Sequence, residues 1–152
     1  NMNTITLREG TLKDTDSIVY FQKQMAMETE AKTLEDDLIR PGVETIFKSS
    51  DKGFYLVAEI GESIVGSLLI TYEWSDWRNA WFWWIQSVYV KKSYRRKGIY
   101  RRLYNEIQNR CKNSKQTCGI RLYVEKENKI AQKVYSDLGM FETNYLLYEK
   151  QL

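Results

Sequence analysis

The stretch from residue 83 to residue 103 constrains the fold more than any other part of the chain. Its first half, Trp83-Trp84-Ile85-Gln86-Ser87-Val88-Tyr89-Val90, is rich in aromatic and β-branched residues and has no Gly, Pro or Asp, which is typical of a strand. After Gly98, apolar residues recur at every fourth position, which is the spacing of one helix face: Ile99, Leu103, Ile107 and Cys111. The sequence therefore predicts a strand, a glycine turn and a helix in direct succession.

The turn between this strand and this helix is strongly basic. The cations at the predicted start of the helix are Arg95, Arg96, Lys97, Arg101 and Arg102. A helix N-terminus already carries partial positive charge, so such a cluster is unfavourable without a negative partner. Helix N–H groups with Arg and Lys nearby are also a common way to bind phosphate. The turn therefore indicates a phosphate site, and a solvated basic turn without a ligand is the alternative.

A second group of residues shares one side of a predicted helix over residues 128–138. Asn128, Ala131 and Tyr135 are separated by three and four positions, which places them on one stripe, beside an apolar stripe that includes Val134 and Leu138. This pattern fits a helix that contacts a ligand as well as the core. It fits equally a helix capped by Asn128 with Tyr135 at the edge of the core.

The two groups together resemble the GNAT superfamily of N-acetyltransferases. Residues 95–100, Arg-Arg-Lys-Gly-Ile-Tyr, are similar to its motif A, Arg/Gln-x-x-Gly-x-Gly/Ala, and Val88-Tyr89-Val90 is similar to its fourth strand. The helical stripe, ending in Leu138-Gly139-Met140, resembles its second cofactor segment. Tyr100 departs from the pattern, because the family usually has a small residue there.

The resemblance implies an enzyme that uses acetyl-CoA as a co-substrate. In the family, loop N–H groups hold the pyrophosphate and strand backbone groups pair with the pantetheine arm. The cofactor-binding residues that it implies are Val88, Tyr89, Val90, Arg95, Arg96, Lys97, Gly98, Ile99, Tyr100, Arg101 and Asn128. It also implies that Tyr135 is the general acid for the leaving thiolate, and that a backbone N–H of the strand polarises the thioester carbonyl.

The implied reaction is direct attack by a primary amine, of a small molecule or a peptide, in a ternary complex. The amine must lose a proton, and the chain has no histidine to accept it. Glu73, at the end of a predicted strand, and Glu30, at the end of the first predicted helix, are the candidate general bases. Each is equally explained as a solvated surface acid.

Composition and length limit the kinds of catalytic and metal site that the chain can have, its number of domains and its location. The absence of histidine excludes Ser-His-Asp and Cys-His catalysis, and two cysteines cannot close a zinc site, so we predict no metal. The length of 152 residues fits one domain, residues 2–152, with Asn1 as an expression remnant. We interpret Cys111 and Cys118 as reduced thiols of a cytoplasmic protein. No apolar run is long enough to span a bilayer, so we expect no membrane partner.

The remaining patterns predict an α/β fold with a mixed sheet. Strands are expected at 4–8, 54–60, 63–74, 83–90, 119–125, 140–142 and 145–150. Helices are expected after a cap at Thr11 and Asp14, over 33–47 with an interruption at Pro41, over 97–112 and over 128–138. The order β-α-α-β-β-β-α-β-α-β-β gives helices on both faces of the sheet. It resembles the GNAT topology along nearly the whole chain.

Two features leave other interpretations open. The aromatic cluster, Trp74, Trp77, Trp81, Phe82, Trp83 and Trp84, fits core packing or a homodimer contact, and alternatively an acceptor pocket. The basic patch over residues 94–102 fits a nucleic-acid-binding domain, but it is short and the rest of the chain is nearly neutral, so we expect no nucleic-acid partner. A CoA-binding protein without turnover is a third alternative to the acetyltransferase.

Overall fold

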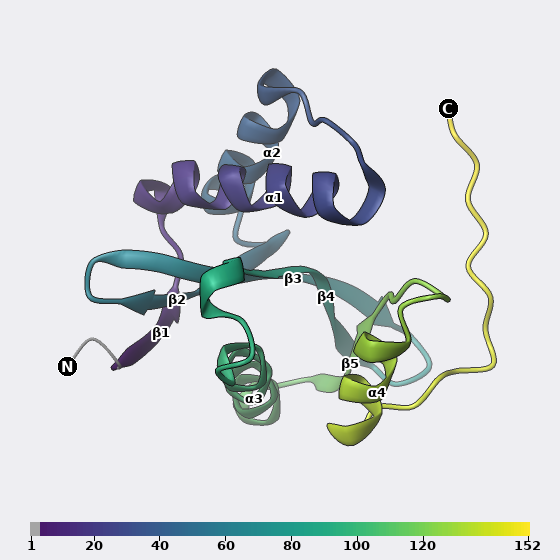
Figure 1. Cartoon of the computed structure of the whole chain (residues 1–152). Helices are drawn as coiled ribbons and strands as arrows, with labels where there is room; N and C mark the ends of the chain where they lie inside the picture. Colours follow the sequence, from purple (N-terminus) through teal and green to yellow (C-terminus); the bar gives the residue numbers. More distant parts are fainter. Residues whose placement is uncertain (1–3) are drawn as a thin grey trace. The chain divides into compact units, whose positions relative to one another are not determined.

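The computed structural model describes residues 4–152 as two compact units, one ending at Leu122 and one running from Tyr123 to Leu152. The first unit holds a five-stranded sheet in the spatial order β1-β2-β3-β4-β5 (Figure 1). Its strands are β1 (Ile5–Glu9), β2 (Gly53–Ile60), β3 (Ser63–Ser75), β4 (Ala80–Val90) and β5 (Thr117–Leu122). The pairs β1–β2, β2–β3 and β3–β4 are antiparallel and the pair β4–β5 is parallel, which confirms the predicted mixed sheet.

Helices cover both faces of this sheet. The helices α1 (Thr15–Glu30) and α2 (Asp36–Lys48) lie on one face, and α3 (Ile99–Asn113) lies on the other (Figure 1). Two single-turn 3₁₀ helices, η1 (Leu12–Asp14) and η2 (Lys92–Tyr94), precede α1 and α3. The crossover from β4 through α3 to β5 is what a parallel pair of strands requires.

The start of α1 is fixed by Asp14. Its carboxylate accepts the Thr11 N–H at 2.8 Å, as the sequence predicts, and it also accepts two bonds from the Arg8 guanidinium at 2.8 and 3.0 Å. The hydrogen bond from Arg8 is the main reason that the pKa of Asp14 lies below its usual value. This partly buried ion pair ties β1 to the beginning of α1.

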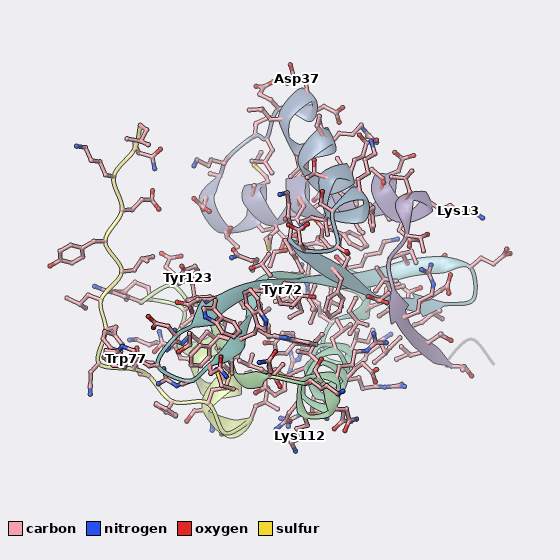
Figure 2. All side chains as sticks on the ribbon, turned by 180° about the vertical axis from the view of Figure 1, so that it is seen from behind. Lys13, Asp37, Tyr72, Trp77, Lys112 and Tyr123 are labelled. Carbon is pink, nitrogen blue, oxygen red and sulfur yellow. The ribbon has the colours of Figure 1, made fainter. Side chains whose placement is uncertain are left out.

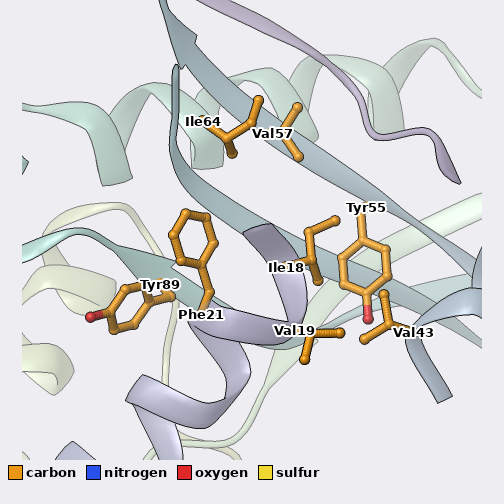
Figure 3. Close-up of a cluster of buried hydrophobic side chains, with 8 residues drawn as sticks. All are labelled: Ile18, Val19, Phe21, Val43, Tyr55, Val57, Ile64 and Tyr89. Atoms are coloured by element: carbon orange, nitrogen blue, oxygen red, sulfur yellow. The ribbon is translucent and has the colours of Figure 1, made fainter. Parts of the chain in front are cut away.

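The core beneath α1 and α2 is a cluster of eight buried side chains (Figure 3), namely Ile18, Val19, Phe21, Val43, Tyr55, Val57, Ile64 and Tyr89. The prediction that Pro41 interrupts the second helix is wrong, because α2 runs through it. A proline inside a helix costs about 3 kcal/mol, and burying one large apolar side chain recovers about 1.5–3 kcal/mol. Val43 is buried, and Ile39, Ile46 and Phe47 pack against the core, which outweighs that cost.

A β-bulge in β4 decides which residues face which helix. Ile85 pairs with Ile70 and Ser87 pairs with Leu69, so Gln86 is an extra residue. After the bulge, odd-numbered side chains face α1: Ser87 accepts a hydrogen bond from Gln22 of α1 at 3.2 Å. Before the bulge, the odd-numbered Trp83 lies on the α3 face, beside residues of that helix.

The second unit contains α4 (Lys129–Asp137). Asn128 caps it, because its Oδ1 accepts the Ala131 N–H at 3.0 Å, and Gly139 follows it with a φ of +91° as predicted. The predicted closing strands at 140–142 and 145–150 are wrong: residues 140–152 form neither strand nor helix. Alternation of side chains does not supply a backbone partner, and here Phe141, Tyr145 and Tyr148 are exposed.

Three smaller points complete the description. No helix among residues 4–152 is both long enough and apolar enough to cross a membrane. Both cysteines are free; Cys111 is buried and Cys118 is exposed. Asn1 lies outside the described residues, so its interpretation as a remnant stays a prediction, as does the assignment of residues 2–152 to one domain.

Candidate functional site

The second half of β4 has a strand on one side only. Pairing between β4 and β5 ends at Ile85 and Leu122, so within residues 4–122 the segment from Gln86 to Val90 pairs with β3 alone. The Lys91 N–H donates to the Val65 carbonyl at 2.9 Å, and backbone groups alternate along a strand. Val88 and Val90 therefore direct their backbone groups to the open edge, where an extended molecule can pair with them.

The loop that follows is shaped to bind an anion. Arg96 and Gly98 adopt left-handed backbone conformations with φ of +63° and +80°, and α3 begins at the next residue, Ile99. The first hydrogen bond of the helix runs from the Arg102 N–H to the Gly98 carbonyl at 3.1 Å. The N–H groups of Gly98 and Ile99 therefore have no partner within the helix. A Cβ on Gly98 would meet nothing within 4 Å, so there is space in front of this N-terminus.

The basic residues of the loop divide into two groups. Arg96 and Arg101 are exposed and have no ion-pair partner among the described residues, so their guanidinium groups are available to an anion. Lys97 lies over the Tyr94 ring at 5.5 Å, and Arg102 donates to the Ile5 carbonyl at 3.3 Å. Arg95 instead contacts Val90, Glu28 and Tyr89.

Arg95 fastens the loop to both β4 and α1. Its Nε donates to the Val90 carbonyl at 2.7 Å, and its Nη2 donates to Glu28 at 2.9 Å. The Tyr89 hydroxyl donates to the other Glu28 oxygen at 2.8 Å, and the guanidinium lies 5.1 Å from the centre of the Tyr89 ring. These contacts hold the Arg95 side chain against β4 and α1, and its predicted role as a phosphate ligand stays a prediction.

The sequence interpretation missed Glu28. Burial disfavours its charged form, but hydrogen bonds from Tyr89 and Arg95 outweigh burial and hold the pKa of Glu28 below its usual value. Burial, together with Glu28, raises the pKa of Tyr89 to about 12. The available signal is its spacing, because Glu28 continues the apolar stripe of Ile18, Phe21 and Met25 at helical intervals.

Glu73 is held by two donors at the other end of the sheet. Its Oε1 accepts the Trp84 indole N–H at 2.8 Å and the Arg121 guanidinium at 2.8 Å. The pKa of Glu73 is lowered, chiefly by the hydrogen bond from Trp84. Burial opposes this shift, and the hydrogen bond from Arg121 adds to it. A carboxylate stabilised in its charged form accepts a proton less readily, which counts against Glu73 as a general base. Arg121 also stacks on the Phe82 ring at 3.6 Å.

The other predicted residues lie in different surroundings. Glu30, at the end of α1, is exposed and lies 3.9 Å from Lys32. Tyr100 is half-buried in the first turn of α3 and its hydroxyl is shielded from solvent. Asn128 and the half-buried Tyr135 belong to the second unit, so their roles toward the cofactor stay predictions.

Comparisons with known proteins agree with this geometry. A possible acetyltransferase from Clostridium difficile 630 is 45% identical, with 97% of each chain covered and a TM-score of 0.92. AAC(6')-Iy in complex with a bisubstrate analog of CoA has the same fold, at 18% identity, 99% coverage of each chain and a TM-score of 0.81. An aminoglycoside acetyltransferase from an uncultured soil metagenomic sample, in complex with sisomicin, matches at 14% identity over 99% of this chain and 97% of its own, with a TM-score of 0.79.

Two further searches bear on the family. No curated protein matches the chain. The model of the acetyltransferase (GNAT) family matches residues 20–140, which include the open edge of β4, the basic loop and α4. The chain belongs to the acetyltransferase (GNAT) family.

Proposed function

We propose that this chain transfers the acetyl group of acetyl-CoA to a primary amine of a small molecule or peptide, by direct attack in a ternary complex. The observation that carries the proposal is one continuous feature. The open edge of β4 leads directly into a loop of left-handed residues and a helix N-terminus that carries cations. The edge suits an extended amide-bearing arm, and the loop suits a diphosphate.

The residues fit acetyl-CoA at both ends. Val88 offers backbone groups at the open edge and Val90 offers its N–H, since the Val90 carbonyl accepts Arg95 Nε. At the helix N-terminus, a Cβ on Gly98 would meet nothing within 4 Å, which leaves space beside the N–H groups of Gly98 and Ile99. Arg96 and Arg101 add charge without a competing carboxylate. Bound acetyl-CoA supplies an acetyl group activated as a thioester.

Each of the remaining steps is assigned to a residue of the chain. A backbone N–H at the open edge of β4 donates to the thioester carbonyl and stabilises the charge that develops there. Tyr135 donates its phenolic proton to the departing sulfur. The proton of the attacking amine goes to a carboxylate, for which Glu30 and Glu73 are the candidates. Because two donors already stabilise the charge of Glu73, we prefer Glu30 for this role.

Calorimetry followed by a thiol-release assay tests the proposal. We expect acetyl-CoA to bind at one site, with an affinity that weakens as salt is added because phosphate contacts contribute. Free thiol should then appear only when an amine is present. The amine panel should include polyamines, a peptide N-terminus and an aminoglycoside, because two proteins of the same fold were crystallised with aminoglycoside-type ligands.

Three other outcomes would contradict the proposal in different ways. No heat with acetyl-CoA in a folded sample would remove the cofactor site. Binding without thiol release across the whole panel would leave a CoA-binding protein without turnover. Retention on DNA with a steep salt dependence, and no affinity for CoA, would favour a nucleic-acid-binding domain.

A further inference from the structure

A hollow of about 460 Å³ lies on the α3 face of the sheet, on the opposite side from Tyr89 and Glu28. It is formed entirely within the first unit, between β1, the aromatic residues of β2, β3 and β4, and the C-terminal half of α3. Figure 2 shows Tyr72 of this wall, labelled on the sheet. None of the residues assigned above to acetyl-CoA or to proton transfer lines this hollow.

The floor of the hollow is a corner of three aromatic rings. Phe54 and Trp83 have ring centres 5.6 Å apart and planes at 78°, and Tyr72 and Trp83 have centres 5.9 Å apart and planes at 64°. Trp83 is only 7% exposed, so its position is fixed by packing. Rings at steep angles to one another surround a bound group on more than one side, which favours a compact apolar or cationic group.

The rim of the hollow gives it negative charge. Glu106 forms an ion pair with Arg110 at 2.8 Å, so these two charges largely cancel. Glu9 also lines the hollow, and its carboxylate has no hydrogen bond or ion pair with any described residue. Burial raises the pKa of Tyr72, and the negative charge of the nearby Glu9 raises it further. Two carboxylates against one guanidinium leave one negative charge beside the rings.

We propose that this hollow binds an organic cation, an alkylated ammonium whose positive charge lies between the aromatic corner and the Glu9 carboxylate. Its volume is within the range of small-molecule sites, about 300–1,000 Å³. Aromatic ring faces attract a weakly hydrated cation and a carboxylate adds long-range attraction, whereas a neutral ligand gains only apolar contact. This is a second site, at the C-terminal half of α3, and it is separate from the anion loop at the N-terminus of that helix.

Choline and its neutral carbon analogue, 3,3-dimethylbutan-1-ol, form a matched pair of probes, because they differ in charge at nearly equal shape. Each is titrated into the full chain while NMR follows the indole N–H signals of the tryptophans. We expect choline to shift the Trp83 signal and to bind about 5- to 30-fold more tightly than the neutral analogue, as a cation–π contact of 1–2 kcal/mol predicts. Equal affinities for the two probes would overturn the proposal.

Variants locate the binding. Glu9→Gln should weaken choline binding several-fold, and Tyr72→Leu should weaken it further. Glu62→Gln removes an equally exposed charge from the β2–β3 turn and should have no effect. If choline binds Glu9→Gln as tightly as the unchanged chain, the cation does not lie in this hollow. Acetyl-CoA titrated in parallel should bind all three variants alike, so failure of this site is distinct from failure of the transferase.

Discussion

The two halves of β4 are stabilised by similar chemistry but have different neighbours. In the first half, Glu73 of β3 accepts bonds from Trp84 of β4 and Arg121 of β5, so one carboxylate links three adjacent strands. In the second half, where β5 has diverged, Glu28 of α1 accepts bonds from Tyr89 of β4 and from Arg95 of the loop. A helix and a loop replace the missing strand as lateral support.

This difference shows how a sheet can present an open edge without losing order. An unsupported strand edge is mobile and prone to unwanted pairing. Here the Glu28 network holds the Tyr89 side chain of the second half, and within residues 4–122 no strand pairs with Val88 on the β5 side. We infer that the first half serves stability, and the second half is the part that we propose for binding. The following predictions test this division, from the largest expected effect to the smallest.

The largest effect is expected for Gly98→Glu. It places bulk and negative charge where the diphosphate is proposed to bind, and like charges at a site cost several kcal/mol, which weakens acetyl-CoA binding by about 100-fold or more. Calorimetry measures the loss. Gly61→Glu is the matched control, because Gly61 has a φ of +61° and open space around it but lies in the β2–β3 turn. Unchanged binding by Gly98→Glu would remove the loop from the site.

Tyr135→Phe separates binding from chemistry. If the phenol protonates the departing sulfur, its loss should lower kcat by about 100-fold or more and leave the acetyl-CoA dissociation constant unchanged. Steady-state kinetics and calorimetry measure the two quantities. An equal loss in both quantities would make Tyr135 a residue that binds acetyl-CoA, and the proton donor to the sulfur would have to be another group.

Glu28→Gln tests the support of the second half. The amide still accepts the Tyr89 bond but loses its charge toward Arg95, so we expect acetyl-CoA to bind about 3- to 10-fold more weakly, as for a charged hydrogen bond reduced to a neutral one. Glu28→Asp should recover part of the loss. Glu35→Gln, an exposed acid before α2, is the control. No change in affinity would mean that the loop holds its shape without Glu28.

Glu73→Gln tests the support of the first half. Its pair with Arg121 is partly exposed, so the free energy of unfolding in urea should fall by no more than about 1 kcal/mol. Acetyl-CoA affinity should not change. The Michaelis constant of the amine should rise if the acceptor binds near this end of β4. A large loss of acetyl-CoA affinity would contradict the assignment of the two halves.

The smallest effect at neutral pH comes from titration of the carboxylates. The pKa values of Asp14, Glu28 and Glu73 are lowered in the folded chain, so their stabilisation is full above the unfolded pKa values, about 3.9 for Asp and 4.3 for Glu. It is lost as the pH falls through the folded values. In urea unfolding, these groups should therefore contribute equally to the free energy of unfolding at pH 6 and pH 8, and should contribute less at pH 3.5. Asp14→Asn should show a shallower acid dependence.

Local patterns predicted much of the site and missed its supports. The strand through Val90, the glycine turn and the helix after Gly98 follow from side-chain periodicity and turn chemistry, which are local. Glu28 and Arg95 are 67 positions apart, and their contact depends on how α1 packs on the sheet. The bulge at Gln86 depends on register between two strands. The closing strands were predicted from alternation alone, which does not show whether a partner strand is present.

The extra residue at Gln86 has a consequence for variation in this chain. It is the reason that Tyr89 points toward α1 and that Trp83, six positions earlier, points toward α3. Deleting that single residue would exchange the two sides for everything that follows it in the strand, sending the phenol away from Glu28 and valine side chains toward it. Length, more than residue identity, is therefore what this position must preserve.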